Sequence, residues 1–104
     1  MKKLIIQIPA YNEAETLPEV LDDLPRHLEG IANIQVIVID DGSTDNTAQV
    51  ALEHGADFVL RHRNNRGLSK SFISGIQLAL ALGADIIVHT DAGHQYPGTD
   101  IAHL

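Results

Sequence analysis

The chain has 104 residues, enough for one domain with a small core and too few for two. Lys and Arg total 7 against 14 Asp and Glu, so the formal net charge is −7, and this acidity argues against a nucleic-acid partner, whose phosphates require a basic surface. The absence of cysteine excludes a disulfide framework and a thiolate metal site.

The N-terminus carries Lys2 and Lys3 before an apolar run that Gln7 interrupts. This run is shorter than the roughly 7 apolar residues that a secretory signal needs. No stretch approaches the roughly 18 apolar residues of a membrane span. We therefore expect a cytoplasmic protein.

Four short apolar segments, rich in isoleucine and valine, predict strands at residues 4–8, 34–39, 58–60 and 85–89. These segments do not alternate with polar residues, which is typical of strands that are covered on both faces of a parallel sheet. Segments with helical spacing lie between them. The alternation predicts an α/β fold, an open parallel sheet with helices on both faces.

The first predicted helix follows the first strand. Asn12 is expected to cap it, with Glu15 completing a capping box, and Pro25 should kink or end it. Its apolar face would consist of Leu17, Leu21, Leu24 and Leu28.

The second and third predicted helices follow the second and third strands. Ser43 or Thr44 would cap the second helix, and Gly55 would end it. The third helix would end at Gly83, and Gly75 inside it indicates close packing, because glycine costs a helix interior about 1 kcal/mol relative to alanine. The apolar face of the third helix is expected to comprise Leu68, Phe72, Ile73, Ile76, Ala79 and Leu80.

Each predicted strand is followed by a polar segment, at residues 9–13, 40–45, 61–67 and 90–95. Ligands of open α/β sheets bind at the carboxyl ends of the strands, so four polar segments on this edge favour a binding site. Each segment alone also has a simpler explanation, because turns and helix caps select the same residue types. We expect His62 and His94 to have surface or supporting roles, and His89 to be a core residue with its hydrogen bonds satisfied.

The polar segments favour the binding of a nucleoside diphosphate. Asp41 could accept hydrogen bonds from a base or a ribose, and Arg66 and Lys70 could offset phosphate charge. Asp91 could hold Mg²⁺ or Mn²⁺, which prefer oxygen ligands. No Gly-x-Gly-x-x-Gly follows the first strand and no Gly-Lys-Ser/Thr loop occurs, which disfavours an ordinary dinucleotide fold and an ATPase.

Four motifs occur in a specific order and spacing: IPAYNEAETLPEVL, VIVIDDGSTDNT, NRGLSKSFISG and TDAGHQYPG. In these motifs the sequence resembles the family 2 glycosyltransferases of the GT-A fold, and most of all the branch that transfers a sugar from a nucleotide to polyprenyl (dolichyl-type) phosphate. The resemblance implies one nucleotide-sugar-binding domain over residues 1–104, truncated at its C-terminus. This domain would be the N-terminal half of a Rossmann-like GT-A fold, with strand order 3-2-1-4.

The resemblance also implies roles for individual residues. Asp41 would bind the nucleoside and Asp40 would support its loop, while Gly67 and Lys70 would lie near the nucleotide. Ala92 would also contact the donor. The base and ribose pocket would be lined by Pro9, Ala10, Tyr11 and Glu13.

Asp91 would be the first acid of the family's Asp-x-Asp metal motif, with Gln95 as a further group near the metal. The second acid should be residue 93, which is glycine here and supplies no side-chain ligand. We therefore expect weakened binding of Mg²⁺ or Mn²⁺. His94 is a candidate replacement ligand, and it would favour Mn²⁺ because imidazole suits the softer ion.

The family continues for about as many residues again, so this chain is expected to bind the donor and to lack most of the acceptor side. No residue can be assigned as the catalytic base. By resemblance, the acceptor would be a polyprenyl phosphate at the inner face of a membrane. The fourth strand, at 85–90, would leave an open edge, which predicts a homodimer.

Two other functions stay open at this point. One is a truncated or degenerate module that binds nucleotides or partners without catalysis, which glycine at position 93 favours. The other is a sugar-phosphate nucleotidyltransferase, which is less favoured because its glycine-rich N-terminal loop is missing.

Overall fold

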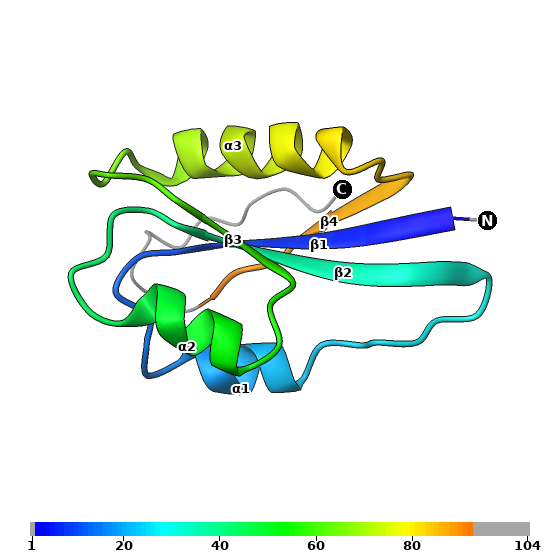
Figure 1. Ribbon diagram of the computed structural model, residues 1–104, viewed down its shortest axis with the longest axis horizontal. Helices are drawn as coiled ribbons and strands as arrows, with labels where there is room; N and C mark the ends of the chain where they lie inside the picture. The colour runs from blue at the N-terminus through cyan, green and yellow to red at the C-terminus, as the bar shows by residue number, and fades with distance from the viewer. Residues whose placement is uncertain (1, 93–104) are drawn as a thin grey trace.

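A four-stranded parallel sheet forms the centre of the protein in the computed structural model, which describes residues 2–92 (Figure 1). The elements in chain order are β1 (Lys2–Ala10), α1 (Leu17–Asp22), β2 (Ile31–Asp40), α2 (Thr47–Glu53), β3 (Phe58–Arg61), α3 (Leu68–Ala81) and β4 (Ile86–His89). The strand order is β3-β2-β1-β4, and each neighbouring pair is parallel. The predicted α/β fold and its strand order 3-2-1-4 are confirmed.

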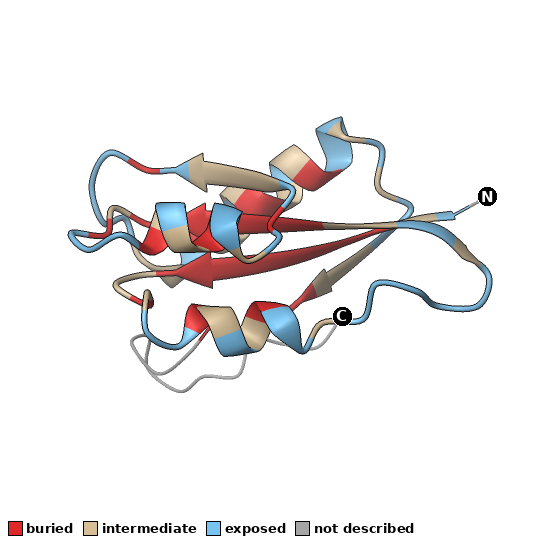
Figure 2. Cartoon of the chain, turned by 60° about the horizontal axis from the view of Figure 1, so that its bottom comes forward, coloured by how far each residue is buried: buried red, intermediate tan, exposed pale blue. Residues whose placement is uncertain are grey.

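Helices cover both faces of the sheet, with α3 on one face and α1 and α2 on the other (Figure 1). Ile6 and Ile8 of β1 pack on the side of α1 and α2, whereas Ile5 packs with Ile37 of β2 on the side of α3. This alternation follows from the period of two along a strand. Much of β1 and β2 is buried (Figure 2), which explains why both strands are continuous apolar runs in the sequence.

Helix α3 packs on the sheet through small residues, and the apolar face predicted for it is only partly correct, because Ala79 is buried as predicted but Ile73 and Leu80 are not. Its buried residues are Ser71, Gly75 and Ala79, whereas Ile73 and Leu80 are 52% and 61% exposed. Small residues recur every four positions, so the helix backbone can lie close to the strands beneath it. None of the described helices is long and apolar enough to cross a membrane.

The caps predicted for α1 and α2 are wrong, because the residues expected to cap helices bind the neighbouring loop. Asn12 adopts a left-handed conformation, with φ of 52°, and its Oδ1 accepts a hydrogen bond from the Thr44 amide at 2.8 Å. The N-cap residues are Thr16 and Asn46, and neither forms a side-chain cap hydrogen bond. Tertiary contacts therefore decide where these short helices begin.

Helix α1 is also shorter than the leucine pattern predicts. It ends at Asp22, before Pro25, so Leu24 is only half-buried and Leu28 is 44% exposed. Gly55 and Gly83 follow the ends of α2 and α3 with φ of 98° and 85°, as predicted.

Gly75 permits the close approach between α3 and the sheet, and the expected close packing is confirmed. A Cβ atom on Gly75 would lie 1.5 Å from Gln7 Oε1 and 2.8 Å from Ile39 Cδ1. Gln7 is fully buried, so its side chain has little room to move away.

The Gly75→Ala variant should lower the free energy of unfolding by about 1–3 kcal/mol, the usual cost of overpacking a core. The better helix propensity of alanine offsets only about 1 kcal/mol of this effect. Urea denaturation monitored by circular dichroism measures the change. Gln77→Ala, at an exposed position of the same helix, is the control, and a Gly75→Ala variant as stable as wild type would contradict the packing.

Candidate nucleotide site at the carboxyl edge of the sheet

Six hydrogen bonds between residues 10–14 and 41–47 join the chain after β1 to the chain after β2, and four of them are 3.0 Å or shorter. The Asp41 amide donates to the Ala10 carbonyl at 2.9 Å. Further along, the Asn12 amide donates to Ser43 Oγ at 2.9 Å, and the Glu13 amide to Thr47 Oγ1 at 3.0 Å. The fourth is the contact between Asn12 and Thr44 described above. The first two polar segments of the sequence therefore form one continuous surface.

Asp41 connects this surface to the loop that follows β3. Its carboxylate is fully buried; Oδ1 accepts a hydrogen bond from the Arg66 amide at 2.9 Å, and Oδ2 accepts one from the Gly67 amide at 2.8 Å. Hydrogen bonds from amides favour the charged form of a carboxylate. The negative charge of Asp41 thus fixes the chain at the point where α3 begins.

His62 forms a buried bridge between Asp41 and α3. Its Nδ1 lies 2.7 Å from Asp41 Oδ1, and its Nε2 lies 2.9 Å from Ser74 Oγ. A neutral ring protonated at Nδ1 donates to the carboxylate and accepts from the hydroxyl, which satisfies both contacts. Sequence reasoning gave His62 only a general supporting role. The register pairs Asp40 with Arg61, so the next residue on each strand, Asp41 and His62, could have been expected to meet.

Asp40 stabilises the turn that carries Asp41. Its Oδ1 accepts a hydrogen bond from the Ser43 amide at 3.0 Å, and its Oδ2 lies 3.3 Å from Arg61 Nε. Gly42 in this turn has φ of 75°, and a Cβ there would lie 2.5 Å from the backbone of Asn64. Only glycine allows the loops after β2 and β3 to come this close.

The fourth polar segment reaches the first through Thr16. Thr16 Oγ1 lies 2.9 Å from Glu13 Oε2 and 3.0 Å from the Ala92 carbonyl oxygen. Glu13 and Ala92 are both buried. All four polar segments therefore meet at one edge of the sheet.

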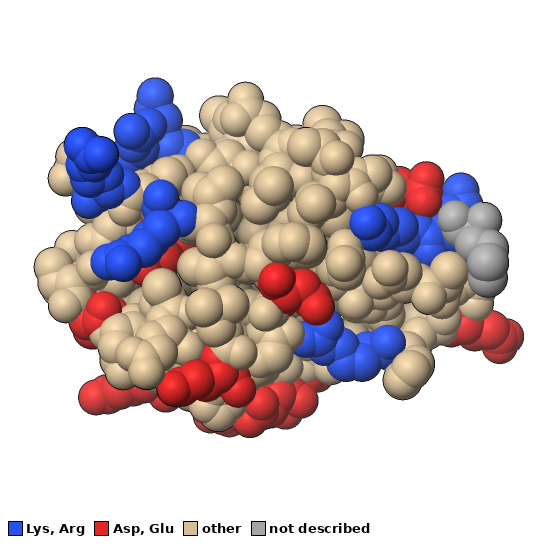
Figure 3. Space-filling view, in the orientation of Figure 1, with Lys and Arg blue, Asp and Glu red and all other residues tan. Residues whose placement is uncertain are grey.

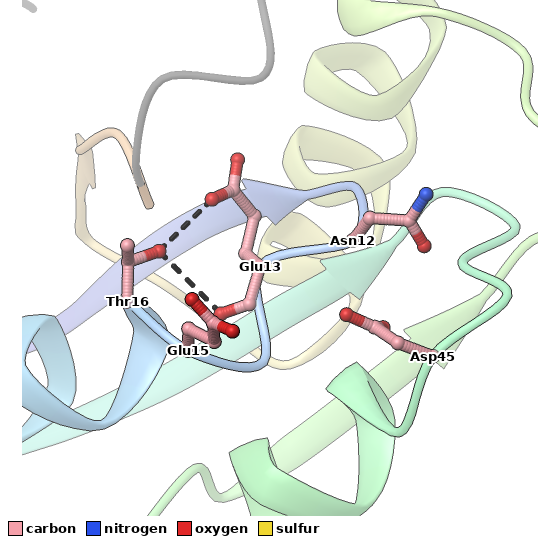
Figure 4. A pocket seen from close by; sticks show the side chains of 5 residues that line it. All are labelled: Asn12, Glu13, Glu15, Thr16 and Asp45. Carbon is pink, nitrogen blue, oxygen red and sulfur yellow. Dashed lines mark hydrogen bonds between the residues drawn. The ribbon is translucent and has the colours of Figure 1, made fainter.

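A polar pocket of ≈ 300 Å³ opens beside this junction (Figure 4). It is lined by Asn12, Glu13, Glu15, Thr16 and Asp45. A second hollow of ≈ 320 Å³ lies next to Arg61, His62 and Arg63. Three of the five residues that line the first hollow are acids, whereas two arginines and a histidine line the second.

The remaining predicted site residues are distributed along the same edge. Pro9 and Ala10 are buried at the end of β1, Tyr11 is half-buried, Gly67 precedes α3, and Lys70 is exposed in the first turn of α3. Their binding roles stay predictions.

Asp91 is exposed just beyond β4. Within residues 2–92, no group of three or more His, Cys, Asp or Glu side chains is arranged to hold a metal ion. Gly93, His94 and Gln95 lie outside the described residues. A carboxylate oxygen fits Mg²⁺ or Mn²⁺, so Asp91 suits the metal role predicted for it but does not form a site with the described residues alone.

His89 differs from its prediction, because neither ring nitrogen has a hydrogen-bond partner among the described residues. The side chain faces α3, packs against the Phe72 ring at 5.0 Å and is 8% exposed. Gln7, its register partner on β1, and Ser71 of α3 also have buried polar atoms without a partner in this part of the chain. Three buried polar side chains therefore lie between the sheet and α3.

Burial lowers the pKa of His89 from the ordinary value of 6.5, and the charge of Asp91 partly opposes this shift. The unfolded chain therefore binds a proton more readily than the folded protein does. This difference in the pKa of His89 contributes to the free energy of unfolding. The contribution is fully present above the pKa of the unfolded chain, and it is lost as the pH falls through 6.5 towards the lower pKa of the folded protein.

Lowering the pH from about 7.5 to about 5.5 should therefore reduce the free energy of unfolding less in His89→Gln than in wild type. Urea denaturation at each pH, in buffer without divalent cations, measures this difference. His27→Gln, which removes an exposed histidine, should retain the wild-type pH dependence. If His89→Gln retains it as well, His89 is not the titrating group.

An open parallel sheet with joined polar loops at its carboxyl edge is the architecture of doubly wound α/β domains, in which ligands bind at that edge. The family model described as glycosyl transferase family 2 matches residues 5–104. The chain belongs to this family.

Two relatives of the chain are named as glycosyltransferases. The chain is 32% identical over 119 residues to UDP-N-acetylglucosamine–dolichyl-phosphate N-acetylglucosaminyltransferase of Methanococcus voltae, covering 99% of this chain and 46% of the relative. It is 35% identical over 105 residues to dolichol-phosphate mannosyltransferase of Pyrococcus furiosus, covering 98% of this chain and 29% of the relative. The chain thus spans less than half the length of these relatives.

Solved structures show the same fold. Glucosyl-3-phosphoglycerate synthase from Mycobacterium tuberculosis, in complex with Mn²⁺, UDP and glucosyl-3-phosphoglycerate, superposes with a TM-score of 0.68 at 26% identity, covering 88% of this chain and 33% of that one. S. aureus TarS 1–349 in complex with UDP gives a TM-score of 0.66 at 23% identity, covering 88% and 27%. At 23% identity, the similarity to TarS concerns the fold alone.

Proposed function

We propose that this chain binds the nucleoside diphosphate of a sugar donor at the carboxyl edge of its sheet, as the donor-binding part of a glycosyltransferase. The observation that carries the proposal is the junction of four polar segments around Asp41 at this edge. The synthase from M. tuberculosis, a structural neighbour, binds UDP together with Mn²⁺. The names of the two relatives add a dolichyl phosphate as the class of acceptor.

The residues around the junction would contact different parts of the donor. Tyr11 and Glu13 would line the base and ribose pocket together with Pro9 and Ala10. Asp41 would bind the nucleoside while its carboxylate holds the loop before α3 in place. Lys70 would offset diphosphate charge from the exposed first turn of that helix.

In the transfer, an acceptor oxygen attacks the anomeric carbon of the sugar while the bond to the diphosphate breaks. A divalent ion, when bound, would neutralise charge on the departing diphosphate. Asp91 and Gln95 would hold this ion, with His94 as a further candidate and Ala92 beside the donor. The catalytic base is not among the residues to which we assign a role.

Two further expectations belong to this proposal. The first is a cytoplasmic location with a polyprenyl phosphate acceptor at the inner membrane face, of which the names of the relatives support only the class of acceptor. Within residues 2–92, β4 pairs only with β1, which leaves the open edge from which a homodimer was predicted.

Calorimetric titration with UDP and GDP, with and without Mn²⁺, tests donor binding. Lys70→Gln should weaken binding of the preferred nucleotide roughly fivefold, on the order of 1 kcal/mol for one exposed charge contact. Lys2→Gln removes an exposed lysine at the opposite end of β1 and should leave the affinity unchanged. If neither nucleotide binds, the proposal fails and a non-catalytic assembly module is favoured.

The metal position is tested by two substitutions with opposite effects. Gly93→Asp should strengthen Mn²⁺-dependent nucleotide binding roughly tenfold, equivalent to about 1.4 kcal/mol, because it adds an anionic oxygen ligand. Asp91→Asn should weaken the same binding by removing one. Titrating Mn²⁺ at fixed nucleotide concentration measures both effects, and unchanged affinity in Gly93→Asp would show that residue 93 does not face the ion.

A further inference from the structure

Positive charge is concentrated in one segment of this acidic chain. Residues 61–84 contain four of the seven Lys and Arg residues and no Asp or Glu. These four form what we call the basic cluster: Arg61, Arg63, Arg66 and Lys70. Figure 3 shows Lys and Arg gathered where β3 leads into α3, whereas acidic side chains lie along the opposite side, near α1 and α2.

Within residues 2–92, most of the basic cluster has no acidic partner. Arg61 lies 3.3 Å from Asp40, but no acidic side chain of residues 2–92 forms a salt bridge with Arg63, Arg66 or Lys70. All four cations are exposed. Their combined charge is therefore available to an external anion.

The outer face of α3 continues from this cluster without a single charge. Residues 71–84 contain no charged side chain, and Ile73 and Leu80 of the outer face are largely exposed. By contrast, α1 carries the exposed acid Glu19 and α2 the exposed acid Glu53. An exposed helix face without charge is typical of a surface that another molecule covers.

We propose that α3 and the loop before it dock on an anionic lipid bilayer. Arg63 and Arg66 of the basic cluster would bind the phosphate headgroups, which leaves Lys70 for the donor diphosphate. Ile73 and Leu80 would enter the boundary between headgroups and acyl chains. The acidic face of α1 and α2 lies on the other side of the sheet (Figure 1), so it would point away from the negative membrane. Charge complementarity therefore sets the orientation as well as the partner.

Self-association through the same face is less favourable. In a twofold-symmetric dimer each copy would contribute the same surface, and residues 61–84 contain no Asp or Glu that could pair with the basic cluster of the other copy. The bilayer accounts for both the cations and the apolar side chains.

Docking on lipid adds a membrane surface to the proposed function. Only its role in bringing donor and acceptor together rests on that function. The basic cluster lies at the start of α3, beside the carboxyl edge where Asp41 holds Arg66 and Gly67. An α3 face on the bilayer would bring the proposed donor site next to a lipid-linked acceptor. Lipid binding itself can be measured without a nucleotide, so the two proposals can fail separately.

Co-sedimentation of the full chain with vesicles tests the proposal. We expect binding to vesicles of mixed phosphatidylglycerol and phosphatidylcholine, little binding to pure phosphatidylcholine, and weaker binding at high salt. Arg63→Gln should reduce the partition coefficient about fivefold, the effect of one basic residue near an anionic surface. Lys2→Gln, which removes a cation outside the cluster, should reduce it less.

The apolar part is tested by a matched pair of variants. Leu80→Glu should reduce vesicle binding at least tenfold, since it places an acid on the docking face. Leu52→Glu makes the same change on α2, where Leu52 is 58% exposed, and should have little effect. Both positions are on the surface, and circular dichroism checks that the variants are folded.

Three results would overturn the proposal. The first is equal binding to neutral and anionic vesicles, and the second is equal loss of binding in Leu80→Glu and Leu52→Glu. The third is no vesicle binding together with a dimer in sedimentation that Leu80→Glu abolishes, which would assign this face to a second copy of the chain.

Discussion

The buried carboxylate of Asp41 determines how the functional edge of this domain is built. A carboxylate removed from water is stable only when donors replace the lost solvent. Here the Arg66 and Gly67 amides and the His62 ring lie within hydrogen-bond distance. Those donors come from the loop after β3, so stabilising one charge at the end of β2 also positions that loop and the first turn of α3.

The same interaction links the two halves of the proposed site. Asp41 is attached to β1 through its amide and to α3 through its carboxylate. The turn containing Gly42 brings the loops after β2 and β3 into backbone contact. On the side of α1, the Thr16 hydroxyl contacts both Glu13 and the Ala92 carbonyl, and so links the chain after β4 to the loop after β1. The polar pocket borders the loops that follow β1 and β2, and the basic cluster extends from the end of β3 into α3.

The sequence predicted the parts of the fold that depend on continuous burial. Strands such as β1 and β2, buried on both faces, are necessarily apolar runs, and the polar segments after them mark the carboxyl edge. The packing face of α3 could not be predicted in this way, because nearly every face of that helix is apolar. Its small residues Ser71, Gly75 and Ala79 decide the face, since they allow the closest approach.

The candidate site was predictable at the level of segments but less so at the level of contacts. The motifs placed Asp41 and Glu13 at the edge, yet Asn12 binds a neighbouring loop in place of capping a helix, and this depends on tertiary structure. The contact between His62 and Asp41 required the strand register. The ring of His89 has no hydrogen-bond partner within residues 2–92. Which residues of α3 face this ring could not be predicted, because the predicted apolar face of the helix is only partly correct.

Hydrogen exchange at the Arg66 and Gly67 amides tests the role of Asp41 most directly. Asp41→Asn keeps the side-chain shape and removes the charge, so both amides should exchange about tenfold faster or more, as expected for the loss of a hydrogen bond to a charged group. The Ile6 amide in the central strand β1 should stay protected in both proteins. Equal protection of Arg66 and Gly67 in wild type and variant would contradict the account, because the loop would then hold its shape without the carboxylate.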